Sequence, residues 1–292
     1  MSINKMPVIC FDLDNTIIDS CTIWQRNALI FGQAFPFQLP GLWALYTQQA
    51  KDKYGIFRFK LTVNNRPELA PSGAGLSLVC YGLYGKKGRQ LQQVIPAMLD
   101  IHCAYTDLLP GAALLLHYLV HTKKYTIVYA TNKDYLTYTI TKKKIDRRHN
   151  NIFGNAPTFV LLAHPTKDFL DARLIVDQAM PVSFQRMVQQ IKNAQEGNTI
   201  FFAPEEQKKP ENRYYELLKK IIKTKIPNHG TILFFDDQKY NVHAAKHNGI
   251  EKSYHVPNGS QIVAIIKALE AENLLSPEVD AKLYQSLANV FK

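Results

Sequence analysis

The chain has 292 residues, of which 46% are hydrophobic and 20% charged. This composition fits a globular protein of one large or two modest domains, and it excludes a disordered, collagen-like or coiled-coil chain. The 35 basic and 24 acidic residues give a net charge of +11, which favours anionic partners without choosing among them. The four cysteines form no metal-binding or disulfide pattern, which indicates a reducing compartment.

The sequence predicts neither an export signal nor a membrane span. The residues before Asp12 contain no long apolar run with a small-residue cleavage site. The most apolar stretch, residues 108–120, is interrupted by Pro110, Gly111 and His117, and it falls short of the ~18 apolar residues of a spanning helix. We therefore expect a soluble, cytoplasmic protein. Export into another cell and the oligomeric state stay open.

Short apolar runs alternate with helical patterns along the chain. The runs predicted as strands are residues 7–11, 125–130, 158–163, 199–202, 232–235 and 253–256. Helices are expected from Gly111 to Leu119, after Asn132 as an N-cap, from Pro210 onward as a first-turn proline, and up to Gly249. The alternation predicts an α/β fold with a Rossmann-like parallel sheet flanked by helices.

Three segments depart from this alternation. Residues 1–20 and 106–258 form the expected core, and residues 21–105 form an insertion with its own small core. Residues 150–198 are a second, irregular insertion within the core. Residues 259–292 are expected to form a C-terminal extension of two amphipathic helices, separated near Ser276 and Pro277.

Polar side chains follow four of the predicted strands: Asp12 and Asp14, Thr131 and Asn132, Lys209, and Asp236 and Asp237. In an open parallel sheet, the carboxyl ends of the strands border the ligand crevice, so these clusters can meet at one edge. Asp12 and Asp14 are two residues apart and would lie on the same side of an extended chain. Neighbouring carboxylates repel, which invites a shared proton or a divalent cation. Hard oxygen ligands suit Mg²⁺, and a lysine suits a phosphate group.

The order of these clusters resembles the four motifs of the haloacid dehalogenase superfamily. Residues 11–16 (FDLDNT) are similar to its first motif and residues 128–132 (VYATN) to its second. Lys209-Pro210 is similar to the third, and residues 234–237 (FFDD) with Asn241 to the fourth. The form of the fourth motif resembles that of the magnesium-dependent phosphatase branch.

This resemblance implies a role for each matching residue. Asp12 would be the nucleophile that forms an aspartyl-phosphate, and Asp14 the general acid and base. Thr131 with nearby backbone N–H groups, Asn132 and Lys209 would bind the phosphoryl group. Lys208 competes with Lys209 for the place of the motif lysine, and the proline after Lys209 decides for the latter.

The resemblance also implies a Mg²⁺ site and a cap. The ligands would be the carboxylates of Asp12 and Asp236, the main-chain carbonyl of Asp14, and Asp237 directly or through an intermediate. Asn241 is expected only to bond the backbone of its loop. An insertion at residues 21–105 would be a cap domain that closes over the site and selects substrates.

The function predicted in this way is Mg²⁺-dependent hydrolysis of phosphate monoesters. The substrate would be a phosphorylated metabolite, or a phosphotyrosine or other phosphoprotein. The net charge of +11 keeps two alternatives open: a nucleic-acid end phosphatase, and a non-catalytic module of the same fold that binds through its basic surface. The basic run at residues 142–148 is interpreted as a solvated helix face, and His243 and His247 as surface or packing residues.

Overall fold

A six-stranded parallel sheet forms the centre of the molecule. The computed structural model describes residues 5–19, 106–133, 135–163, 199–203 and 207–291. The strand order is β6-β5-β4-β1-β7-β8, and each neighbouring pair is parallel. The strands are β1 (Val8–Phe11), β4 (Thr126–Thr131), β5 (Pro157–Ala163), β6 (Ile200–Ala203), β7 (Ile232–Asp236) and β8 (Lys252–His255). The predicted α/β fold is therefore confirmed.

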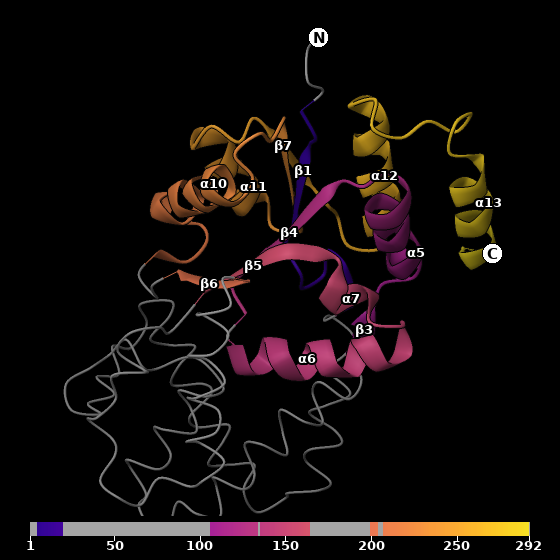
Figure 1. Ribbon diagram of the computed structural model, residues 1–292, viewed down its shortest axis with the longest axis horizontal. Helices are drawn as coiled ribbons and strands as arrows, with labels where there is room; N and C mark the ends of the chain where they lie inside the picture. Colours follow the sequence, from indigo (N-terminus) through magenta and orange to yellow (C-terminus); the bar gives the residue numbers. More distant parts are fainter. Residues whose placement is uncertain (1–4, 20–105, 134, 164–198, 204–206, 292) are drawn as a thin grey trace, which may run out of the picture.

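Helices cover both faces of this sheet (Figure 1). One face carries α10 (Asn212–Lys225) and α11 (Lys239–His247). The other carries α5 (Ala112–His117), which continues as a π-helical turn (Tyr118–Thr122), with α12 (Gln261–Ala271) and α13 (Ala281–Val290). The helices α6 (Tyr135–Arg148) and α7 (Ile152–Asn155) lie on this second side below β4 and β5.

The central strand β1 shows why the sheet is two-sided. All four of its residues are buried, as expected for a parallel strand with helices on both faces. Val8 and Cys10 pack in the cluster with α10 and α11, whereas Ile9 and Phe11 pack in the cluster with α5 and α12. This alternation fixes the register of β1 and carries its last residue, Phe11, to the edge where Asp12 follows.

The structure corrects two local predictions. The helix α10 begins at Asn212, with Glu211 as its N-cap, so Pro210 lies before the helix and not in its first turn. The strand β5 pairs with both β4 and β6, so this part of the predicted second insertion (150–198) belongs to the main sheet. The two predicted helices of the C-terminal extension are present as α12 and α13. Residues 164–198 and the whole of the predicted cap, residues 21–105, lie outside the described residues.

A short antiparallel ladder marks where the first insertion leaves the core and returns. Strand β2 (Ile18–Asp19) pairs with β3 (Asp107–Leu108), with Ile18 opposite Leu108 and Asp19 opposite Asp107. The end of α6 fastens the returning strand, because Arg148 and His149 both contact the carboxylate of Asp107, at 3.2 and 2.6 Å. Within the described ranges, none of the helices combines the length and apolarity that crossing a bilayer requires.

Candidate active site

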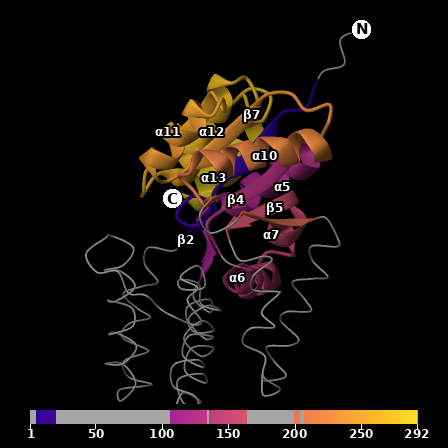
Figure 2. The ribbon, with the colours of Figure 1, turned by 90° about the vertical axis from the view of Figure 1, so that its left-hand side faces the viewer.

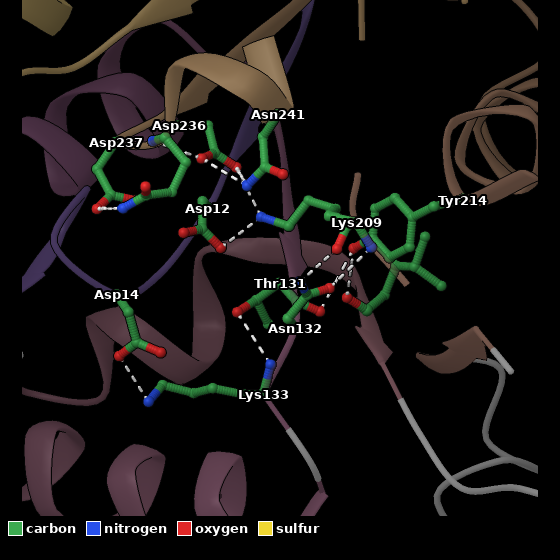
Figure 3. Close-up of polar contacts among 12 residues, drawn as sticks. Asp12, Asp14, Thr131, Asn132, Lys133, Lys209, Tyr214, Asp236, Asp237 and Asn241 are labelled. Carbon is green, nitrogen blue, oxygen red and sulfur yellow. Dashed lines mark hydrogen bonds and ion pairs between the residues drawn. The ribbon is translucent and has the colours of Figure 1, made fainter. Parts of the chain in front are cut away.

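Three of the predicted clusters meet because β4, β1 and β7 are neighbours in the sheet. Asp12 follows β1, Thr131 ends β4 and Asp236 ends β7. The backbone N–H of Asp12 donates to the carbonyl oxygen of Phe235 at 2.8 Å, which extends the β1–β7 contact by one residue. Figure 3 shows these side chains turned toward one another, with Lys209 among them. All four are less than a tenth exposed.

Lys209 joins two of the carboxylates. Its Nζ lies 2.8 Å from Oδ1 of Asp12 and 2.7 Å from Oδ2 of Asp236, and its ammonium sits 5.7 Å from the centre of the Phe234 ring. Lys209 is 3% exposed. Burial opposes its charged form, but the two carboxylates outweigh burial and hold the pKa of Lys209 well above its usual value. The structure thus places Lys209 in the cluster.

The carboxylates outnumber this lysine. Asp12, Asp236 and Asp237 each offer an oxygen within 4.8 Å of the others, so three acids surround one ammonium. Burial raises the pKa of Asp12 to about 7, Lys209 lowers it, and Asp236 and Asp14 raise it further. Burial and Asp236 also raise the pKa of Asp237. An arrangement of hard oxygen donors with surplus negative charge fits a divalent cation such as Mg²⁺.

Asp236 is held by more than Lys209. The Nδ2 of Asn241 donates to both of its carboxylate oxygens, at 2.9 and 3.1 Å, and the backbone N–H of Gln238 donates to Oδ1 at 2.9 Å. The expectation that Asn241 only bonds the loop backbone is therefore wrong. Asn241 lies in the first turn of α11, and from there its side chain reaches back to Asp236 and orients this carboxylate.

Asn132 fixes the lysine from the opposite side. Its Nδ2 donates to the carbonyl oxygen of Lys209, and its Oδ1 accepts the backbone N–H of Lys209, both at 3.0 Å. These bonds tie the end of β4 to the Lys209 segment, 77 positions further along the chain. The sequence suggests that Asn132 caps the following helix. In the structure its side chain instead bonds the backbone of Lys209, and α6 begins at Tyr135. The Lys209–Pro210 peptide bond is cis.

Thr131 and Asp14 lie beside a lysine that the sequence analysis missed. The hydroxyl of Thr131 accepts the backbone N–H of Lys133 at 3.2 Å. The Nζ of Lys133 forms an ion pair with Oδ1 of Asp14 at 2.7 Å. Asp14 is therefore turned toward Lys133 and away from the acidic triad (Figure 3). Lys133 is 7% exposed, and a lysine directly after the second motif was the sequence signal for it.

Other supporting residues also escaped the sequence analysis. Tyr214 and Tyr215, both fully buried on α10, donate their hydroxyls to backbone carbonyls around the site. Tyr214 reaches Leu161 at 3.2 Å, and Tyr215 reaches Asn241 at 2.9 Å. Their buried hydroxyls need partners, and only the folded sheet reveals which carbonyls those are.

No family model and no curated protein matches this chain. Among solved structures, it is similar to a Thermotoga maritima protein assigned as a beta-phosphoglucomutase, with 14% identity, a TM-score of 0.44, and 90% of this chain and 91% of that chain covered. It is also similar to a dehalogenase, with 12% identity, a TM-score of 0.44 and coverages of 87% and 86%. A haloacid dehalogenase-like family hydrolase from Xanthomonas campestris shows 9% identity, a TM-score of 0.42 and coverages of 98% and 97%.

These likenesses are too low to transfer a residue role or an activity. The fold is instead described from the sheet topology and the positions of the motif segments in this structure. A parallel sheet with β1 at its centre brings all four motif segments to one edge, in the order and on the elements that the resemblance requires. The described core thus has the predicted parallel sheet flanked by helices, with the predicted motif segments at one edge.

Proposed function

We propose that this protein is a Mg²⁺-dependent phosphomonoester hydrolase that works through an aspartyl-phosphate on Asp12. The observation that carries the proposal is the buried cluster of Asp12, Asp236 and Asp237 around Lys209. Its surplus of negative charge suits a divalent cation, and that cation would lie beside a carboxylate able to attack phosphorus. The substrate is a phosphorylated metabolite, or a phosphotyrosine or phosphoprotein.

The reaction has two balanced steps. In the first, a carboxylate oxygen of Asp12 bonds to phosphorus while the bond to the leaving oxygen breaks, and Asp14 gives that oxygen its proton. In the second, Asp14 takes a proton from water, the water oxygen bonds to phosphorus, and the bond to Asp12 breaks to release phosphate. Mg²⁺, held by Asp12, Asp236, Asp237 and the Asp14 carbonyl, would offset charge on the phosphoryl oxygens.

The remaining residues position the phosphoryl group. The Lys209 ammonium already touches Asp12, so it can also neutralise a phosphoryl oxygen bonded there. The Thr131 hydroxyl and the neighbouring backbone at Asn132 border the same edge. The side chain of Asp14 is 36% exposed, which places it on the solvent side of the site, and it must leave Lys133 to serve the leaving oxygen.

The first test is hydrolysis of p-nitrophenyl phosphate with Mg²⁺ or with EDTA. We expect turnover with the metal, none with EDTA, and none for Asp12→Asn. The Asp107→Asn variant is the matched control, because that carboxylate lies outside the site. Folded, Mg²⁺-binding protein without turnover on a panel of sugar phosphates, nucleotides and phosphotyrosine peptides would refute the proposal and favour a binding module.

A second test separates the two steps. The p-nitrophenolate leaving group needs no proton, so Asp14→Asn should still transfer phosphate to Asp12 but should lack the base that activates water. We expect a burst of one equivalent of p-nitrophenol, followed by slow turnover, and a phosphorylated Asp12 peptide after acid quenching. A variant with neither burst nor phosphopeptide, while the unaltered protein is active, would contradict the assignment of Asp14.

A further inference from the structure

The two helical layers that cover the sheet differ in charge. In α10 and α11, a single acid, Glu216, faces seven cations: Arg213, Lys219, Lys220, Lys223, Lys225, Lys239 and Lys246. In the opposite layer, the helices α12 and α13 carry two lysines, Lys267 and Lys282, and one acid, Glu270. We call α10 and α11 together the basic layer. It contributes a large part of the chain's net charge of +11.

Six of the seven cations of the basic layer are exposed, whereas Lys219 is half-buried and donates to the carbonyl oxygen of Asn248. The apolar side chains of the two helices face the sheet instead. Tyr214, Leu218 and Ile222 of α10 are fully buried against the sheet, as is Ala245 of α11. The two helices also hold one another: the hydroxyl of Tyr215 bonds the carbonyl of Asn241 at 2.9 Å, and Asn248 bonds Asn212 at 2.9 Å. Figures 1 and 2 show α10 and α11 side by side on one face. The layer is therefore a rigid, continuous surface.

Few of these charges are neutralised. Within the part of the chain that the structure describes, no ion pair joins a cation of the basic layer to a carboxylate. The basic run on α6 differs, since Lys142 pairs with Asp146 at 2.9 Å and Arg148 with Asp107 at 3.2 Å. Among the described residues, α10 and α11 thus carry seven cations without a carboxylate partner, whereas the run on α6 is paired in part.

We propose that the basic layer is a binding surface for a single nucleic-acid strand, separate from the catalytic cluster. The 14 residues of α10 extend over about 21 Å at 1.5 Å per residue. A stacked single strand rises by about 3.4 Å per nucleotide along its axis, so a segment of roughly six nucleotides, each with one phosphate, matches the length of α10. The cations of the layer match this number, and most of them are exposed.

An exposed aromatic side chain favours nucleic acid over a lipid surface. Tyr240, in the first turn of α11, is 58% exposed, and it is the large hydrophobic side chain that the described part of this layer presents to solvent. One aromatic ring among cations suits stacking on a base. An interfacial membrane helix instead needs a broad apolar face to insert, and the apolar faces of α10 and α11 are buried in the core.

The test measures binding of a fluorescein-labelled twelve-residue oligothymidylate, and of an RNA of equal length, to the full chain at several salt concentrations. Six phosphate contacts predict a slope of about −4 in log K against log[salt], or a loss of roughly 300-fold between 50 and 200 mM salt. The triple variant Lys220→Gln/Lys223→Gln/Lys246→Gln should reduce this slope by about 2. Its affinity at 100 mM salt should fall at least tenfold.

The matched control changes three exposed lysines outside the layer: Lys124→Gln, Lys267→Gln and Lys282→Gln. It removes the same charge, and we expect oligonucleotide binding to change less than threefold. Circular dichroism and p-nitrophenyl phosphate turnover should be the same in both variants, since neither touches the catalytic cluster. Equal loss in both variants, no binding at 50 mM salt, or binding only to phosphatidylserine vesicles would each overturn the proposal.

Discussion

The pKa values of two buried aspartates in this molecule are shifted in opposite directions. Asp280, at the start of α13, is 1% exposed. It accepts hydrogen bonds from the Tyr118 hydroxyl at 2.6 Å and the Ser276 N–H at 2.8 Å, and it pairs with Lys123 at 2.8 Å. Burial opposes its ionisation, but these donors outweigh burial and lower its pKa. Asp12 is also buried and has a lysine, yet its pKa is raised to about 7.

Burial raises the pKa of both carboxylates and is the largest cause of the raised pKa of Asp12, but only the neighbours of Asp280 outweigh it. Asp280 is one carboxylate with one lysine and two further donors, so its charge is compensated. Asp12 shares Lys209 with Asp236 and lies beside Asp237. A fold that needed only stability would gain nothing from gathering these acids, because like charges in a buried site raise its free energy. Charge that the protein itself leaves uncompensated therefore distinguishes the candidate site from the buried Asp280.

The largest expected effect is the loss of activity on replacing Asp12, which replacing Asp280 should not cause. Asp12→Asn should lower kcat by at least 10³-fold, equivalent to about 4 kcal/mol of activation free energy, because the amide cannot attack phosphorus. Its melting temperature without metal should stay equal or rise, since one of the repelling charges is gone. Steady-state kinetics and thermal unfolding of the same preparation measure both. Retained activity would remove Asp12 from the mechanism.

Lys209→Met should affect both stability and activity. Without the ammonium, the two buried carboxylates of Asp12 and Asp236 remain beside the half-buried Asp237. The metal-free protein should therefore lose about 3 kcal/mol of unfolding free energy. Mg²⁺ should restore part of that loss, whereas Lys208→Met should leave stability within about 0.5 kcal/mol. Urea unfolding with and without Mg²⁺ gives these values. A Mg²⁺-insensitive loss would show that the cluster holds no cation.

Asp280→Asn should lower the stability of the protein and leave its activity nearly unchanged. Replacing this carboxylate weakens three charge-assisted contacts, which should cost about 2 kcal/mol of unfolding free energy. The kcat for p-nitrophenyl phosphate should change less than twofold, because Asp280 ties α13 to the π-helical turn far from Asp12. Urea unfolding and kinetics at 20 °C below the melting temperature test this. A large fall in kcat in the folded variant would mean that the two regions are coupled.

Asp12 and Asp280 should also contribute to the pH dependence of stability with opposite signs. The pKa of Asp12 is raised from 3.8 to about 7 in the folded protein, so folding binds a proton there, and stability without metal should fall as pH rises from about 4 to 7. Asp12→Asn should lack this fall.

The pKa of Asp280 is lowered in the folded protein. The stability that this carboxylate contributes is therefore present above the ordinary aspartate pKa of 3.8 and is lost as the pH drops below that value. Unfolding of each variant from pH 3 to 8 measures both, and identical profiles for Asp12→Asn and the unaltered protein would refute the first sign.

Local pattern was sufficient to predict the sheet and the meeting of its motifs. The run at residues 7–11 indicated β1 because it is apolar, short and ended by Asp12. The clusters after β1, β4 and β7 meet because parallel strands share a carboxyl edge. The strand β5 was assigned to an insertion, because its apolar run stood within an irregular stretch and the sequence does not state which strand it pairs with.

The contacts that position the site could not be predicted in the same way. Asn132 bonds the backbone of Lys209, and Asn241 bonds the carboxylate of Asp236. Asparagine has equally good local partners in caps and turns, so its sequence context favoured those. Lys133 and its ion pair with Asp14 depend on how the end of β4 turns beside β1. Such choices are made by tertiary geometry, which composition and spacing do not encode.

The ladder between β2 and β3 has a consequence for how the chain can change in length. Because Asp19 and Asp107 face one another, the intervening polypeptide begins and ends at one point of the core. The free energy of closing such a loop grows only with the logarithm of its length, by about 0.6 kcal/mol per doubling. Residues can thus be added or removed there while β1 and β4 keep their register, so this position tolerates evolutionary exchange of whole segments beside an unchanged sheet edge.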